Sequence, residues 1–142
     1  MPGETLEQLE GSIWPSPDYD SYLVSTVHRL RKKPIAEFTV EDLRIMIGQG
    51  VGLPQLMERA VGILERQPLA EGDFYPGDLL SSVVGAESWL ACQPTLAYRV
   101  LAVAKRVVAE PGEVDPALRN RLATFIERVR AKLAQQQDLP RD

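Results

Sequence analysis

The sequence contains one cysteine, Cys92, and one histidine, His28, and this scarcity narrows the chemistry open to the protein. A single thiol cannot form an internal disulfide or a thiolate metal cluster, which is typical of a reducing compartment. Catalytic and metal sites need two to four converging groups, and no second imidazole can join His28. We therefore predict no catalytic residue, metal or cofactor. His28 is interpreted as structural or solvent-facing, and Cys92 as a small buried apolar residue rather than a nucleophile.

The sequence also lacks an apolar run long enough to cross a bilayer, and its first ten residues include three glutamates but no basic residue. Signal and transit peptides carry basic residues at this end, so we expect a cytoplasmic protein without a membrane partner. Of the 142 residues, 44% are hydrophobic and 25% are charged. These values are typical of a globular protein, and residues 1–142 are predicted to form a single domain.

An excess of basic charge, typical of nucleic-acid-binding proteins, is absent too. The net charge at pH 7 is −4 and the pI is near 5.1. Binding to nucleic acid draws most of its affinity from neutralised phosphates, so this balance argues against a nucleic-acid partner and favours a basic one.

Strand-like alternation of apolar and polar residues is rare, whereas apolar residues recur at the helical spacing of three and four throughout the chain. The sequence therefore predicts an all-α domain of six to seven helices. Thr39 with Asp42 predicts a capping box, Asp78 an N-cap, and Pro54 and Pro116 first helical positions. The helix of residues 95–109 has a wide apolar arc and is expected to be central, and the tail from Gln135 is expected to fray. The predicted helices span residues 20–31, 40–47, 54–66, 78–84, 95–109 and 116–134.

Two short motifs allow a functional and a structural interpretation. Gly48, Gly50 and Gly52 precede a helix, as in a phosphate-binding loop, but no strand comes before them and no Gly-Lys-Ser or Gly-Lys-Thr follows. A tight turn between helices is the better interpretation. The basic run from Arg29 to Lys33 could contact phosphate, but acidic residues flank it on both sides, which favours a solvated helix end.

The segment from Glu71 to Asp78 combines acidic and aromatic side chains in a predicted loop. Aromatic side chains bury a large area at low entropic cost, and acids supply electrostatic complementarity to a basic partner. We therefore identify a candidate partner-binding site. The alternative is that both aromatic residues enter the core while Asp73 and Asp78 cap backbone groups. The candidate residues are Glu71, Asp73, Phe74, Tyr75 and Asp78.

Five blocks in the first part of the chain resemble the immunity proteins of contact-dependent growth inhibition (CDI) systems. They are LEQLE at 6–10 with Trp14, HRLRKKPI at 28–35, TVEDLR at 39–44, IGQ at 47–49 with Gly52 and Leu53, and PLAEGDFYPGDLL at 68–80. The resemblance covers residues 6–84, so the helices predicted at 95–109 and 116–134 rest on periodicity alone.

The resemblance implies a helical inhibitor, not an enzyme, in the bacterial cytoplasm. Such a protein binds and neutralises the cognate C-terminal toxin domain of a surface-displayed effector, and a basic nuclease would suit the acidic balance. A helical adaptor or regulatory protein-binding module without a toxin partner is the alternative. The resemblance does not assign contacts residue by residue, because immunity surfaces must differ between toxins while their scaffold need not.

Overall fold

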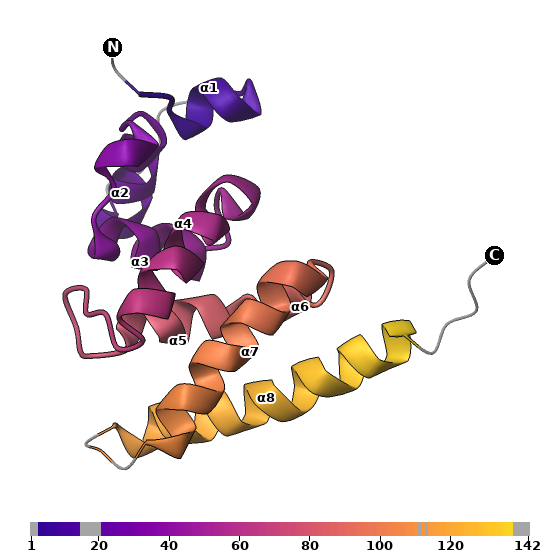
Figure 1. Cartoon of the computed structure of the whole chain (residues 1–142). Coiled ribbons are helices and arrows are strands. Elements are labelled where there is room, and N and C mark those ends of the chain that lie inside the picture. Colours follow the sequence, from indigo (N-terminus) through magenta and orange to yellow (C-terminus); the bar gives the residue numbers. More distant parts are fainter. Residues whose placement is uncertain (1–2, 15–20, 111, 113, 138–142) are drawn as a thin grey trace.

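The computed structural model describes residues 3–14, 21–110, 112 and 114–137, and within these segments the fold is all-α as predicted (Figure 1). They form eight α-helices and one 3-10 helix, with a single isolated β-bridge between Glu71 and Pro76. The elements are α1 (Leu6–Glu10), α2 (Tyr22–Arg31), η1 (Ile35–Glu37), α3 (Val40–Gly48), α4 (Leu53–Arg66), α5 (Asp78–Gly85), α6 (Glu87–Leu90), α7 (Pro94–Ala109) and α8 (Pro116–Gln137).

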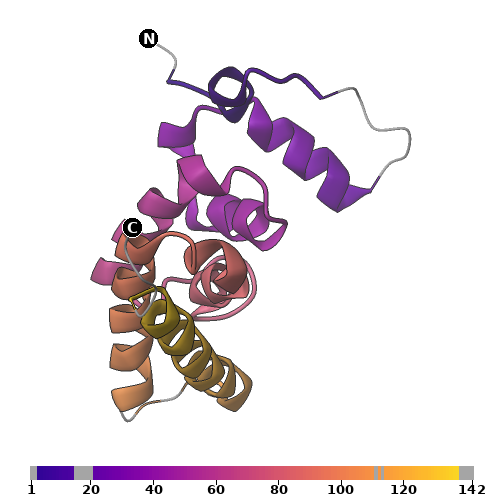
Figure 2. The same cartoon turned by 90° about the vertical axis from the view of Figure 1, so that its right-hand side faces the viewer.

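The helices are stacked from α1 and α2 at one end to α7 and α8 at the other (Figures 1 and 2). In the middle, α3 packs on α2, α4 and α5. The long helix α8 lies against both α7 and α5, and α4 lies against α7. Because α4 and α8 cover different sides of α7, its wide apolar arc is buried as the sequence predicted. The buried residues of α7 are Ala97, Val100, Leu101, Val103, Ala104 and Val107.

The predicted helix starts are confirmed at Thr39 and at Pro116, the first residue of α8, whereas α4 begins at Leu53, one residue before Pro54. Thr39 and Asp42 form the expected capping box, in which the Thr39 hydroxyl accepts from the Asp42 amide and the Asp42 carboxylate accepts from the Thr39 amide. The sequence missed two short helices, α1 and α6, because five and four residues are too few to show a period. It also ended α8 too early, since the helix continues to Gln137 instead of fraying from Gln135.

The basic run is not the solvated helix end that the sequence suggested. The Arg31 side chain is 1% exposed, and its Nη2 lies 2.6 Å from Glu10 Oε1, while its guanidinium carbon lies 4.1 Å from the centre of the Trp14 ring. Lys33 Nζ lies 2.6 Å from Asp42 Oδ2. Two of the four basic side chains therefore hold helices together, with Arg31 joining α2 to α1 and Lys33 joining the start of α3 to the end of α2.

The turn between α3 and α4 has the tight geometry that its glycines predicted. Gly50 and Gly52 both have φ +71°, a conformation in which a side chain is strained. They differ in their surroundings, because a Cβ on Gly52 would lie 2.9 Å from both methyl carbons of the fully buried Leu6, whereas a Cβ on Gly50 would meet nothing within 4 Å.

Alanine substitutions at Gly50 and Gly52 distinguish the cost of backbone strain from the cost of steric crowding. Gly50→Ala should destabilise the protein by about 1 kcal/mol through strain alone. Gly52→Ala should cost a further 1–3 kcal/mol, roughly, because Leu6 must move and α1 with it. Urea denaturation of the two variants measures the difference. Equal losses of stability would mean that Leu6 and α1 move to accommodate the new methyl group at no cost.

Candidate functional site

The acidic aromatic loop, residues 71–78, is organised around the carboxylate of Asp78. This side chain is buried and accepts hydrogen bonds from three backbone amides of the loop, those of Gly72 at 2.7 Å, Phe74 at 3.1 Å and Tyr75 at 3.4 Å. A carboxylate that accepts several amide hydrogens is a strong local constraint, because charge-assisted hydrogen bonds are about twice as strong as neutral ones. Asp78 therefore fixes the course of the loop in front of α5.

This arrangement corrects the predicted role of Asp78 as the N-cap of its helix. The N-cap of α5 is Gly77, with φ +94° and no side-chain cap. Asp78 occupies the first helical position instead, and its carboxylate turns back toward the loop. The reason is close packing at Gly77, where a Cβ would lie 2.6 Å from Leu118 of α8, so a residue with a capping side chain does not fit there.

Helix α3 supplies a second support for the loop, which sequence reasoning missed. Arg44 and Glu41 form a two-pronged ion pair with both N–O distances at 2.6 Å, and Glu41 Oε1 also accepts from the Asp73 amide at 2.9 Å. The Arg44 guanidinium carbon lies 4.3 Å from the centre of the Phe74 ring, and its Nε lies 3.8 Å from Asp78 Oδ2. The one available signal was the spacing of Glu41 and Arg44, three residues apart on a helix.

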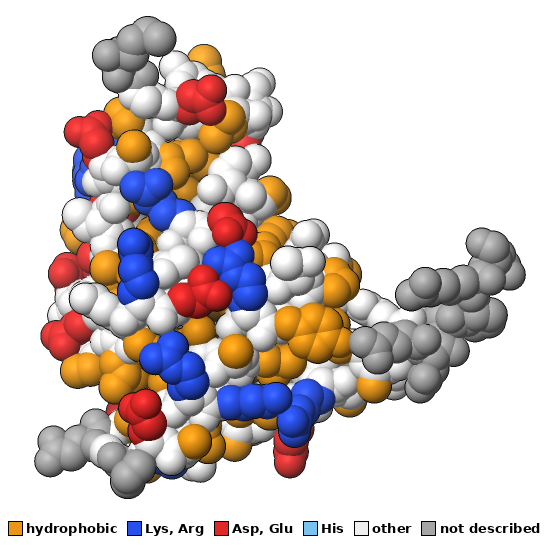
Figure 3. Space-filling view, in the orientation of Figure 1, with side chains coloured by type: hydrophobic (Ala, Val, Ile, Leu, Met, Phe, Trp, Pro, Cys, Tyr) orange, Lys and Arg blue, Asp and Glu red, His pale blue; other side chains and the backbone are white. Residues whose placement is uncertain are grey.

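The candidate residues divide by exposure. Phe74 is 68% exposed, and Glu71 and Asp73 are exposed as well. Tyr75 is half-buried against the core, while Asp78 is only 3% exposed. In Figure 3, acidic side chains lie along the left-hand edge of the molecule, where Figure 1 places this loop. The structure thus brings Glu71, Asp73 and Phe74 to the surface and uses Tyr75 and Asp78 to support them.

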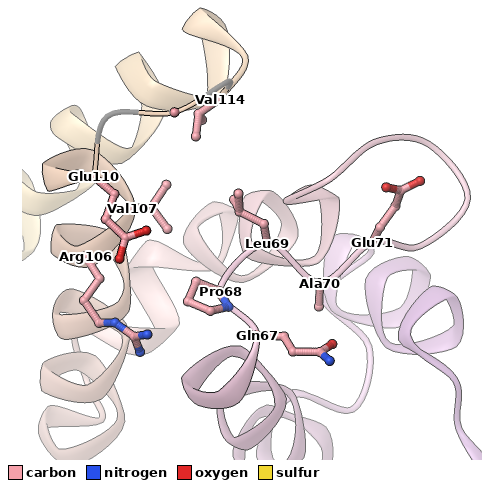
Figure 4. Close-up of a pocket in the computed structure, with 10 residues that line it drawn as sticks. Gln67, Pro68, Leu69, Ala70, Glu71, Arg106, Val107, Glu110 and Val114 are labelled. Atoms are coloured by element: carbon pink, nitrogen blue, oxygen red, sulfur yellow. The ribbon is translucent and has the colours of Figure 1, made fainter.

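A groove adjoins the loop at Glu71 (Figure 4). It has a volume of about 460 Å³ and lies between the chain leaving α4 and the end of α7. Apolar side chains form its walls, with Pro68 and Leu69 on one side and Val107 and Val114 on the other. Two charged residues lie beside it, Arg106 on α7 and Glu110 directly after the end of that helix. Together the loop and this groove offer an exposed aromatic ring, acidic charge and an apolar recess on neighbouring surfaces.

Other residues considered from the sequence have structural surroundings. His28 is half-buried on α2, where its Nδ1 lies 2.9 Å from the Val24 carbonyl and its ring packs edge-on against Trp14. Cys92 was expected to be buried and is exposed, because α6 ends at Leu90 and it is Leu90 and Ala91 that turn inward. Within the described residues, no three His, Cys, Asp or Glu side chains are grouped as metal ligands.

The ion pair between Glu41 and Arg44 beneath the loop makes the stability of the protein depend on pH in the acidic range. The hydrogen bonds from Arg44 lower the pKa of Glu41 below its ordinary value of 4.5, against the opposing effect of burial. A carboxyl group with a lowered pKa in the folded state stabilises the protein above its unfolded pKa, and this contribution disappears as the pH falls through the folded pKa.

The stability of the unsubstituted protein should therefore fall as the pH decreases below about 4.5, and Glu41→Gln should show a shallower decline in the same range. The measurement is urea denaturation of both proteins at a series of acidic pH values. Glu58→Gln is the matched control, since that carboxylate is 68% exposed and should leave the decline unchanged. Parallel curves for Glu41→Gln and the unsubstituted protein would contradict the assignment.

Comparison with known proteins gives one family match. Residues 8–95 match the family model of the CDI immunity proteins. The matched segment begins within α1 and ends at the start of α7, so it includes the loop with both of its supports, Asp78 and the pair from α3. No curated protein matches the chain.

Proposed function

The chain belongs to the CDI immunity proteins, and on this premise we propose that it binds and neutralises the C-terminal toxin domain of its cognate contact-dependent growth inhibition effector. The family implies toxin neutralisation in general and is typically not enzymatic. The observation that carries the proposal is the family match over residues 8–95, which covers more than half of the 142-residue chain. The place of action we propose is the cytoplasm of the producing cell. None of the described helices has the length and apolar character to span a bilayer.

We propose the acidic aromatic loop and the adjoining groove as the toxin-binding surface. Phe74 is large, exposed and held over Arg44, so it offers contact area without losing much freedom on binding. Glu71 and Asp73 surround it with negative charge, which favours a basic partner surface. The groove beside Glu71 can accept an apolar side chain of that partner. A basic nuclease is the toxin that this charge would suit best.

The proposal predicts that a toxin domain is encoded directly upstream of this chain, and that domain is the partner for its test. Calorimetry between the two purified proteins should give a Kd of about 1 μM or lower, the range of specific protein complexes. Deletion of the gene should be lethal only while the toxin is intact. Absence of binding at micromolar concentration, together with survival of the deletion strain, would instead indicate an adaptor without a toxin partner.

The charge of the loop should act mainly on the rate of association. Glu71→Lys with Asp73→Lys reverses two exposed charges, and we expect association with the toxin to be at least about tenfold slower at low salt. The effect should shrink as salt screens the charges. Stopped-flow binding at several salt concentrations measures it.

Asp78 is left out of that variant because it supports the loop from inside. The matched control is Glu37→Lys with Glu58→Lys, a pair of equal charge on other exposed positions. If both pairs slow association equally, net charge is responsible and the interface lies elsewhere.

A further inference from the structure

The parts of the chain before and after residue 95 carry opposite net charge, a feature that the acidic loop does not explain. Residues 1–95 contain 14 acidic and 7 basic side chains, while residues 96–142 contain 9 basic and 6 acidic side chains. All eight described basic residues of the second part belong to α7 and α8. Although the protein is acidic overall, the helices α7 and α8 at one end of the stack are basic. Figure 2 shows α8 beside α5.

Two polar hollows adjoin along α8. The first, of about 480 Å³, lies between α8 and the junction of α5 with α6, and its polar lining includes Arg121, Thr124 and Arg128 from α8 and Ser88 from α6. The second, also about 480 Å³, extends toward the turn after α3 and includes Ser81 and Ser82. Arg121 and Gly85 line both hollows, so they form one continuous surface, which we call the α8 groove.

Arg121 is held in position at the centre of the α8 groove. Its Nη1 donates to Ser81 Oγ at 2.5 Å and its Nη2 donates to the Ser81 carbonyl at 3.3 Å. Gly85 lies beside the guanidinium, and a Cβ there would be in ordinary van der Waals contact with Nη2 at 3.5 Å. These bonds use two of the five N–H hydrogens of an arginine and neutralise none of its charge.

The two arginines of the α8 groove differ in their partners from the three arginines that form ion pairs elsewhere in the described structure. Arg31, Arg44 and Arg99 each pair with a carboxylate. Within the described part of the chain, neither Arg121 nor Arg128 has a carboxylate within 4.0 Å. The acid that does line the groove, Glu87, is bound to Lys132 at 2.8 Å. The groove thus presents two uncompensated guanidinium groups with hydroxyl groups between them.

We propose that the α8 groove binds an acidic segment of a partner polypeptide, with one carboxylate on Arg121 and one on Arg128. Seven residues separate these arginines on a helix, which is about 10 Å. Carboxylates three residues apart in an extended polyproline II segment lie about 9 Å apart on the same face, so the spacings match. Arginine and carboxylate also match in shape, as two-pronged pairs. A nucleic acid fits less well, because it carries a charge at every nucleotide and the acidic remainder of the protein repels it more strongly than a segment with a few carboxylates.

This surface has the opposite charge to the proposed toxin-binding loop and does not depend on it. The probe for its test is a synthetic peptide of four Glu-Pro-Pro repeats, in which proline holds the extended form and glutamate recurs at every third residue. Titration of the isotope-labelled full chain at low salt, followed by amide NMR shifts, should move the signals of Gly85, Ser88 and Thr124. The corresponding Gln-Pro-Pro peptide should move them little.

The variants decide whether the two arginines are responsible. Arg121→Gln with Arg128→Gln should weaken binding of the glutamate peptide about tenfold or more. Lys105→Gln with Arg130→Gln removes equal charge from the depression that α7 and α8 form beside Tyr98, and should weaken binding less than the Arg121 and Arg128 pair does, since neither side chain lines the α8 groove. Arg128→Gln alone keeps the hydrogen bonds from Arg121 to Ser81. This single variant should also bind the glutamate peptide more weakly, and its binding can be measured even if the double variant is unstable.

Three results would overturn the proposal. They are equal binding of the glutamate peptide to the double variant and the unsubstituted protein, equal binding of the glutamine peptide, and tighter binding of inorganic phosphate or a DNA oligonucleotide at the same amides. The last result would make the groove a phosphate site instead.

Discussion

Asp78→Ala is expected to lower the free energy of unfolding by about 3 kcal/mol and to release the acidic aromatic loop from α5. The substitution removes the acceptor of three backbone hydrogen bonds in a side chain that is 3% exposed. Leaving buried donors unsatisfied costs about 1–3 kcal/mol for each group, and part of this is recovered when the loop opens to water. Urea denaturation measures the loss, and hydrogen exchange of the Gly72 and Phe74 amides reports the opening of the loop.

Asp73→Ala is the control for this prediction. It removes the same charge from the same loop, but the Asp73 side chain is exposed and it is the Asp73 backbone that bonds to Glu41. A surface change of this kind should alter stability by about 0.5 kcal/mol or less. If Asp78→Ala has an effect equally small, the carboxylate does not organise the loop and another contact must do so.

Phe74→Ala is expected to weaken toxin binding by about tenfold to a hundredfold while leaving stability nearly unchanged. The ring is 68% exposed in the free protein, so truncation removes little buried area from the fold. In a complex it would occupy the centre of the proposed surface, where aromatic anchors account for much of the affinity. Calorimetry with the toxin domain measures the first effect and thermal denaturation the second.

Tyr98→Ala serves as the matched control, because Tyr98 is 47% exposed on α7 and lines a depression separate from the loop. We expect its toxin affinity to stay within about twofold of the unsubstituted protein. An unchanged affinity for Phe74→Ala would remove the loop from the interface, even if calorimetry with the toxin upholds the immunity function itself. A large loss for Tyr98→Ala alone would move the interface to the α7 and α8 side.

The helices were predictable because their signals are local. The i to i+3 and i+4 spacing of apolar residues identified α2, α3, α4, α5, α7 and α8, and the capping box at Thr39 located the start of α3. The helices that escaped prediction are α1 and α6, with five and four residues. Such short helices depend on their ends and on packing more than on a repeating pattern.

The loop shows where local reasoning failed. The sequence offered two alternatives for residues 71–78, presentation to a partner or burial with capping. The structure exposes Phe74, as the first alternative requires, and packs Tyr75 and Asp78 inward, as the second does. Phe74 faces outward while Tyr75 packs inward, although the two are neighbours of similar size. The Phe74 ring lies over Arg44 and the Asp73 amide bonds to Glu41, residues 30 or more positions earlier in the chain that meet the loop only after α3 packs on α5.

The sequence by itself determined the all-α class, the positions of the long helices and the resemblance to the CDI immunity proteins, since each rests on residues close together in the chain. Only the tertiary structure decided which charges are satisfied inside the fold and which have no opposite charge beside them in the described part of the chain. Arg31 and Asp78 are buried among their own ion pairs or hydrogen bonds, whereas Arg121 and Arg128 line a groove without a carboxylate partner in the described part of the chain. The physical reason is that a charge acquires its partner through space, from helices that are distant in sequence, and composition records only how many charges there are.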